Sequence, residues 1–178
     1  MEKKVCIIGA GSSGIAAAKT FFQSNIPFDC FEKGSKIGGN WLYGNDNGMS
    51  SSYYSLHINT SKQMMAFSDF PMPDSYPDYP NHELVFQYFE AYMDKFGFRN
   101  KISFNTTVER VEKIDENKYV VYTNKFPPKE YTDVIVANGH HWSPKWATFD
   151  GEFSGKISHS HYYKTYSENI KKVEAVEK

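Results

Sequence analysis

VCIIGAGSSGIAAAKTFFQSNIPFDCFEK, residues Val5–Lys33, is the stretch that decides the fold. It begins with the apolar run Val5–Ile8, and three glycines in G-x-G-x-x-G spacing separate this run from a helix-like segment. Gly9 permits a tight strand-to-helix turn, Gly11 lets a pyrophosphate approach the backbone, and Gly14 lets the helix pack closely on the strand. A phosphate group at this turn would lie at the helix N-terminus, where free N–H groups and the helix dipole attract anions.

A second predicted strand, Phe28–Phe31, leads directly into Glu32, which lies 18 residues after the third glycine. A carboxylate at this place hydrogen-bonds the ribose hydroxyls of an adenosine and would repel a 2′-phosphate. Strand, helix and acidic residue all fall where this mechanism needs them, so the stretch predicts a site for an ADP-containing cofactor. The alternative is a turn that only packs, with Glu32 as a solvated surface charge.

The bulk composition is that of one globular domain. The chain has 178 residues, 40% of them hydrophobic, and a net charge of −1, which suits one sizeable core and does not indicate binding to nucleic acid or to a membrane surface. Cys6 and Cys30 lie in predicted buried strands and are expected to be inert, and no C-x-x-C motif exists. His140 and His141 lack partners at metal-ligand spacing, so no metal site is expected. We recognise neither a signal peptide nor a membrane span, and expect a cytoplasmic location.

Loops with distinct compositions follow the first two strands. Gly34–Trp41 is a second glycine-rich turn, which could wrap a cofactor from the opposite side, or could be a plain loop anchored by Trp41. Gly44–Ser52 is small and polar, and we expect it to be exposed and mobile. Phe67–Tyr79 contains several prolines, which predict an irregular covering loop with buried aromatic residues.

The second half of the chain predicts one helix and several strands. Apolar residues at helical spacing predict a helix over His82–Phe96, with Asn81 as its N-cap and Gly97 as its terminator. Strands are predicted at Ile102–Phe104, Thr106–Ile114, Lys118–Thr123 and Tyr131–Ala137. We expect an antiparallel meander between residues 102 and 123. The expected parallel sheet contains Val5–Ile8, Phe28–Phe31 and Val134–Ala137.

Six short motifs follow one another along the chain. They are GAGSSG at 9–14, FEK at 31–33, IGGNW at 37–41, NTSKQMMAFSDFPMP at 59–73, VIVANGHH at 134–141 and FSGKISHSHYY at 153–163. In this order they resemble the flavin-containing monooxygenases. The last motif fits that family's fingerprint, F-x-G-x-x-x-H-x-x-x-[FY], through Phe153, Gly155, His159 and Tyr163. Related Baeyer–Villiger enzymes place Trp and then Pro or Asp where this chain has Tyr163-Lys164, which favours the flavin monooxygenase branch.

The resemblance implies a site for FAD and for NADPH. The implied cofactor-binding residues are Gly9, Ala10, Gly11, Ser12, Ser13, Gly14, Glu32, Lys33, Gly39, Asn40, Trp41, Asn59 and Thr60. Within this set Glu32 would bind the adenosine ribose, and Asn40 with Trp41 would form part of the flavin-side wall. Asn59 is the implied catalytic residue, because an uncharged amide can hold a nicotinamide or donate to bound oxygen without offering a proton. The alternative is an asparagine that caps a turn. His159 is expected to be structural.

The resemblance also implies a fold class and a domain arrangement. We expect an α/β fold, in which a Rossmann-like FAD-binding domain combines a central parallel sheet with an antiparallel β-meander. Residues 1–150 would form this domain, and residues 151–178 a linker towards an NADPH-binding domain. The 178 residues contain no second G-x-G-x-x-G. We therefore expect the N-terminal FAD part of a longer two-domain flavoprotein, whose FAD domain later chain would complete.

The implied function is NADPH-dependent oxygenation of a small nitrogen or sulfur nucleophile by dioxygen, through a C4a-hydroperoxyflavin. A Baeyer–Villiger or N-hydroxylating relative is one alternative, and a non-catalytic FAD-binding fragment is another. No nucleic acid is expected among the partners. Exposed aromatic residues are expected among Phe67, Phe70, Tyr76 and Trp142, and these would favour association into a homo-oligomer.

Overall fold

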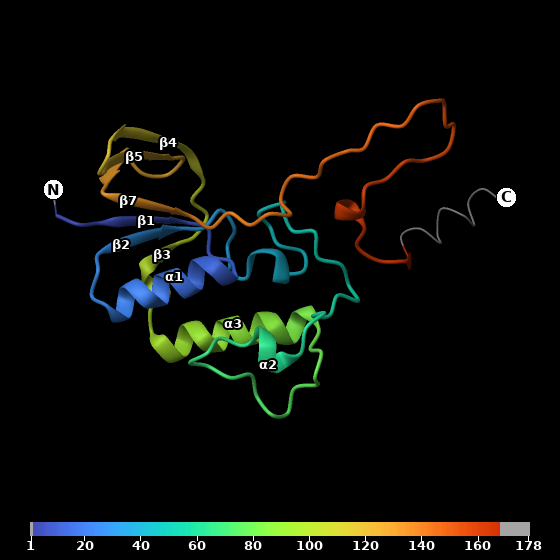
Figure 1. Ribbon diagram of the computed structural model, residues 1–178, viewed down its shortest axis with the longest axis horizontal. Coiled ribbons are helices and arrows are strands. Elements are labelled where there is room, and N and C mark those ends of the chain that lie inside the picture. The colour runs from blue at the N-terminus through green and yellow to red at the C-terminus, as the bar shows by residue number, and fades with distance from the viewer. Residues whose placement is uncertain (1, 168–178) are drawn as a thin grey trace.

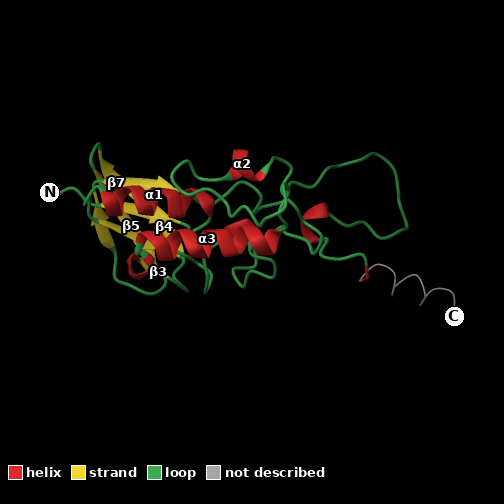
Figure 2. Ribbon diagram, turned by 90° about the horizontal axis from the view of Figure 1, so that it is seen from below, coloured by secondary structure: helices red, strands yellow, loops and turns green. Residues whose placement is uncertain are grey.

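The computed structural model describes residues 2–167 and arranges them in three layers (Figure 1). A parallel sheet forms the middle layer. The helices α1 (Ser12–Gln23) and α3 (His82–Phe96) cover one of its faces, and an antiparallel sheet covers the other. Figure 2 shows the two helices lying side by side, with the short helix α2 (Lys62–Met65) beyond them. The predicted α/β class, with one parallel and one antiparallel sheet, is confirmed.

The parallel sheet has the strand order β3-β2-β1-β7, with β1 spanning Val5–Ile8, β2 Phe28–Phe31, β3 Ile102–Ser103 and β7 Asp133–Val136. Val5 faces Phe28 on one side and Asp133 on the other, so the prediction that the first and last strands lie in one parallel sheet is confirmed. The placement of Ile102–Phe104 in the antiparallel meander is wrong, because β3 runs parallel to β2. The chain leaves β2, passes through α3 and re-enters the sheet in the same direction, as a crossover requires.

The antiparallel sheet consists of β4 (Val108–Asp115), β5 (Lys118–Thr123) and β6 (Lys129–Tyr131). The expected antiparallel pairing is confirmed for β4 and β5, and in the turn between them the Asp115 carboxylate accepts a hydrogen bond from the Asn117 N–H at 2.9 Å.

The prediction of one strand over Tyr131–Ala137 is wrong, because the chain changes sheets near its start. Tyr131 ends β6 and Asp133 begins β7, with Thr132 between them. The Thr132 N–H donates to the carbonyl of Lys4 at 2.9 Å, and the Lys4 N–H donates to the Thr132 hydroxyl at 3.1 Å. These two bonds tie the junction to the start of β1. Only Tyr131 of the predicted strand belongs to β6, and no glycine or proline marks the change of sheet in the sequence.

The core has one part on each side of the parallel sheet, because successive strand residues point to opposite faces. Val5 and Ile7 belong to the larger cluster on the helix side, whereas Cys6 packs with Tyr131 and Val121 on the other side. Burial raises the pKa of the Cys6 thiol to about 12, and the nearby Asp29 adds to the increase. Burial also raises the pKa of Cys30. Both thiols are therefore protonated at neutral pH, and the prediction that they are buried is confirmed.

The helix α3 has the ends that the sequence predicts. The Asn81 side chain accepts a hydrogen bond from the Leu84 N–H at 3.0 Å, a cap that stabilises a helix by about 1 kcal/mol. Gly97 ends the helix at a φ of +73°, in the left-handed region, and its N–H donates to the Met93 carbonyl. No helix within residues 2–167 has both the length and the apolar character needed to cross a membrane.

Phe67–Tyr79 forms an irregular cover over α3, as predicted, without regular helix or strand. The Phe67 ring lies 4.3 Å from the Tyr92 ring, measured between centroids, and the Phe70 ring lies 5.4 Å from that of Tyr88. The prediction that Phe67, Phe70 and Tyr76 are exposed is therefore wrong, since all three pack against the core. Trp142 is 44% exposed, in agreement with the prediction.

Candidate functional site

The turn between β1 and α1 is built from glycines that the fold itself requires. Gly9 has a φ of +98°, and a Cβ there would lie 2.6 Å from the carbonyl oxygen of Ala137. A Cβ on Gly14 would lie 1.9 Å from the carbonyl oxygen of Gly9. Backbone atoms cannot move aside as a side chain can, so only glycine fits at either position.

Gly11 is different, because nothing in the fold requires a glycine there. Its φ of −73° and ψ of −170° are ordinary extended values. A Cβ would meet only the Cα of Gly39 at 3.6 Å and its nitrogen at 4.0 Å, which are normal van der Waals contacts. The missing side chain leaves space beside the backbone, and this space fits a group such as a pyrophosphate that must approach it closely.

The N-terminus of α1 has free hydrogen-bond donors. Gly11 is the N-cap residue, so no side chain caps this helix, and the first turn contains no acidic residue. The first backbone N–H groups of a helix have no partner within it. Those of Ser12 and Ser13 are therefore suited to an anion, and the positive end of the helix dipole favours one.

Glu32 is buried beside this turn, with 4% of its surface exposed. One carboxylate oxygen accepts from the Ala10 N–H at 2.7 Å, and the other accepts from the Gly34 N–H at 2.8 Å. The alternative of a solvated surface charge is therefore wrong. Each carboxylate oxygen keeps a second lone pair, so the ribose-binding role stays a prediction.

The second glycine-rich turn lies directly against the first. Gly38 and Gly39 have φ values of +106° and +54°, and the Gly38 N–H donates to the Ala10 carbonyl at 3.0 Å. The short 3-10 helix η1 (Gly39–Trp41) follows, and Trp41 packs against the core. Sequence reasoning did not include Gly38 in the candidate site, although the paired glycines were a signal for it.

The prediction that Gly44–Ser52 is exposed is wrong for Asn45 and Ser52, which are buried, whereas Gly44, Asp46 and Gly48 are exposed. The Asn45 side chain donates to the Gly39 carbonyl at 2.9 Å and accepts from the Asn47 N–H at 3.0 Å. Asparagine side chains can replace backbone partners in this way, which stabilises an irregular loop. The loop is therefore fastened to the second glycine turn.

Lys33, Asn59 and Thr60 are exposed. Asn59 follows the buried Ile58 and precedes α2, and within residues 2–167 its side chain makes no hydrogen bond. This amide is therefore not a turn cap, and its polar atoms are available to a ligand. No hydrogen bond in the described part of the chain joins Asn59 or Thr60 to the glycine turns, so their roles stay predictions.

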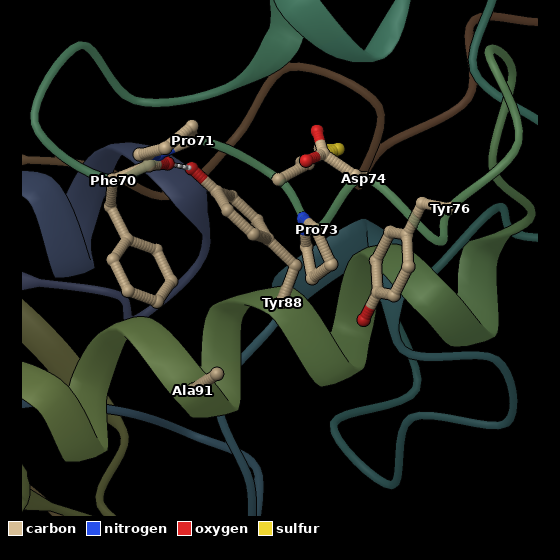
Figure 3. A pocket seen from close by; sticks show the side chains of 8 residues that line it. Phe70, Pro71, Pro73, Asp74, Tyr76, Tyr88 and Ala91 are labelled. Atoms are coloured by element: carbon tan, nitrogen blue, oxygen red, sulfur yellow. Dashed lines mark hydrogen bonds between the residues drawn. The ribbon is translucent and has the colours of Figure 1, made fainter.

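A shallow groove of about 440 Å³ lies between α3 and the covering loop (Figure 3). Its lining consists of Phe70, Pro71, Met72, Pro73, Asp74, Tyr76, Tyr88 and Ala91. None of these belongs to the cofactor-binding set that the sequence predicts. The Tyr88 hydroxyl is already bonded to the Phe67 N–H and to the Phe70 carbonyl. The groove therefore offers no free polar group from Tyr88, and we assign no chemistry to it. Residues 2–167 also contain no cluster of three or more His, Cys, Asp or Glu that could hold a metal ion.

Comparison with known proteins identifies the family. A family model described as flavin-binding monooxygenase-like matches residues 2–175. The chain belongs to this family. Flavin-containing monooxygenase 5 of Rattus norvegicus is 36% identical over 176 residues, which make up 92% of this chain and 33% of that protein. The chain thus spans about a third of the length of this relative.

Two solved structures extend the comparison with the flavin-binding monooxygenase-like family. The S-allyl-L-cysteine S-oxygenase of Allium sativum superposes with a TM-score of 0.84 at 29% identity, covering 93% of this chain and 43% of that one. A cyclohexanone monooxygenase variant of Rhodococcus sp. Phi1, bound to NADP+, superposes with a TM-score of 0.66 at 25% identity, covering 77% of this chain and 26% of that one.

The fingerprint of this member of the flavin-binding monooxygenase-like family lies on a long arm, residues 138–163. The arm leaves the body of the domain after β7 and turns back towards it (Figure 1). His159 accepts a hydrogen bond from the His161 N–H at 3.1 Å, and its ring lies 5.3 Å from the Trp146 ring. These contacts support a structural role for His159. The predicted linker also includes residues 168–178, which lie outside the described residues.

Proposed function

We propose that this chain is the FAD-binding portion of an NADPH-dependent monooxygenase that oxygenates small nitrogen or sulfur nucleophiles with dioxygen. The observation that carries the proposal concerns Gly11. The fold does not require a glycine at this position, which lies at the uncapped N-terminus of α1. Bound FAD would supply the redox and oxygen-transfer chemistry that the family resemblance implies.

The described residues would hold FAD at both glycine turns. Gly11 leaves room for the pyrophosphate, and the N–H groups of Ser12 and Ser13 would donate to it. Glu32 would bind the ribose and keep the two turns together, and Asn40 with Trp41 would form part of the flavin-side wall. Asn59 would offer its amide to the nicotinamide or to bound oxygen.

The rest of the proposal follows the family. Residues 1–150 would be the FAD domain, and residues 151–178 would lead to an NADPH-binding domain. The S-oxygenase neighbour, with the higher TM-score and identity, supports a sulfur nucleophile, whereas the cyclohexanone monooxygenase neighbour supports the Baeyer–Villiger alternative. A cytoplasmic location and a homo-oligomeric state stay predictions.

Gly11→Val tests the FAD site directly. We expect the variant to fold and to lose FAD, because the valine side chain fills the space that the pyrophosphate needs. Its free energy of unfolding should fall by only about 1 kcal/mol, since valine is a poorer N-cap than glycine. Urea unfolding measures the stability, and quenching of flavin fluorescence measures FAD binding. Thr20→Val, an exposed position on the same helix, should keep both properties. A folded Gly11→Val protein with wild-type FAD affinity would contradict the assignment.

Reaction with NADPH distinguishes a complete catalyst from a FAD-binding portion. The 178 residues contain a single G-x-G-x-x-G. We therefore expect slow flavin reduction that does not saturate with NADPH, because the 178-residue protein would not orient the hydride of NADPH. Anaerobic stopped-flow absorbance of the FAD-loaded 178-residue protein measures this rate. Fast, saturable reduction would show that the chain binds NADPH productively by itself.

A further inference from the structure

The residue that directly follows the fingerprint fastens this segment to a distant loop. The Lys164 ammonium group donates to the carbonyls of Ser50 at 2.7 Å and of Ser52 at 3.0 Å. The Tyr54 N–H donates to the Lys164 carbonyl at 2.8 Å, and the rings of Tyr53 and Tyr163 lie 6.0 Å apart. Both the side chain and the backbone of Lys164 therefore hold the end of the fingerprint against residues 50–54.

The same loop is bonded to the flavin-side wall. The N–H and the hydroxyl of Ser51 donate to the Asn40 side-chain oxygen at 2.8 and 2.9 Å, and the Ser50 hydroxyl donates to the Asn40 carbonyl at 3.1 Å. Asn40 lies in η1, directly after the glycine pair that is bonded to Ala10. A continuous path of hydrogen bonds and short backbone segments thus runs from Lys164 to the residue beside Gly11.

The chemistry of lysine suits this link. An ammonium group has three donors and no acceptor, so it can bridge several carbonyl oxygens at once. Hydrogen bonds from a charged donor are stronger than bonds between neutral groups. Lys164 is half-buried, as are Ser50 and Ser51, so water competes only in part for these bonds.

We propose that Lys164 is a positioning residue, which couples the fingerprint segment to the FAD site by holding the loop that orients Asn40. The proposal rests on the proposed FAD site. It predicts that loss of the ammonium group loosens residues 38–41, although the bonds of Lys164 described above go to Ser50, Ser52 and Tyr54, and thereby weakens FAD binding.

The test compares Lys164→Met, Lys164→Arg and the control Lys145→Met. Methionine preserves the length of the side chain and removes its donors, arginine restores a charged donor, and Lys145 is an exposed lysine on the arm that precedes Lys164. Hydrogen–deuterium exchange of the FAD-free protein reports on residues 38–41 and 50–54, and flavin fluorescence reports the Kd for FAD. We expect faster exchange in both regions for Lys164→Met, and a Kd for FAD that is about tenfold higher. Lys164→Arg should recover part of both effects, and Lys145→Met should match the wild type.

The two readouts separate the possible failures. If only residues 50–54 exchange faster in Lys164→Met, Lys164 holds only the loop that it contacts, and the proposal is wrong. If residues 38–41 exchange faster but the Kd for FAD is unchanged, Lys164 does not affect FAD binding and the proposal is wrong. If the wild-type chain binds no FAD, the proposed function fails. Exchange at residues 38–41 then still shows whether Lys164 keeps the flavin-side wall in place.

Discussion

Replacing Gly14 with alanine is expected to lower the free energy of unfolding by about 3 kcal/mol or more. The new Cβ would lie 1.9 Å from the carbonyl oxygen of Gly9, so α1 would have to move away from β1. Overpacking in a core costs about 1–3 kcal/mol and sometimes more, and a clash with the backbone lies at the upper end. The total stability of a domain is only about 5–15 kcal/mol. Circular dichroism during urea unfolding measures the loss.

Gly11→Ala is the matched control, because both glycines belong to one motif and the substitution is the same. The new Cβ at Gly11 meets only a 3.6 Å contact, so the unfolding midpoint should stay close to that of the wild type. Equal midpoints for the Gly14→Ala and wild-type proteins would show that the turn is not packed as described.

Removal of the Glu32 carboxylate should have the second largest effect. Glu32→Ala leaves the buried N–H groups of Ala10 and Gly34 without their acceptors. An unsatisfied buried donor costs about 1–3 kcal/mol. At about 1–2 kcal/mol for each of the two donors, we expect the free energy of unfolding to fall by about 2–4 kcal/mol. Urea unfolding without FAD measures this loss separately from any effect on the cofactor.

Two further variants define the Glu32 result. Glu32→Gln keeps one acceptor oxygen and should lose about half as much stability. Glu116→Ala removes an exposed carboxylate in the β4–β5 turn and should change stability by less than about 0.5 kcal/mol.

Under conditions where Glu32→Ala is folded, we expect FAD binding to weaken by about 1.5–3 kcal/mol, the value of a charge-assisted hydrogen bond. A Glu32→Ala protein as stable as the wild type would contradict the role of the carboxylate in joining the turns.

The elements that depend on local sequence could be predicted. The helix α3 has a periodic apolar face, a capping asparagine at Asn81 and a glycine at Gly97, and each signal acts within a few residues of its effect. The glycine turn could also be predicted, because its spacing reflects direct contacts between β1 and α1.

The elements that depend on distant partners could not be predicted. The change of sheet at Thr132 is set by its bonds to Lys4, 128 residues away, and no residue near Thr132 indicates it. In the same way, the order of the loop at residues 44–52 comes from Asn45 reaching Gly39. For Glu32, sequence reasoning predicted a residue beside the cofactor, but its two backbone partners became visible only once the turns were placed together.

The pairing of β1 with β7 also has a consequence for synthesis on the ribosome. One edge of β1 meets its partner only after 128 further residues have been made, which takes roughly 6–26 s at roughly 5–20 residues per second. During this interval the nascent chain presents an apolar strand with an unpaired edge, a template on which other chains can aggregate. Chaperones that bind extended apolar segments should therefore engage nascent chains that end before β7, and should release them once Asp133–Val136 has emerged.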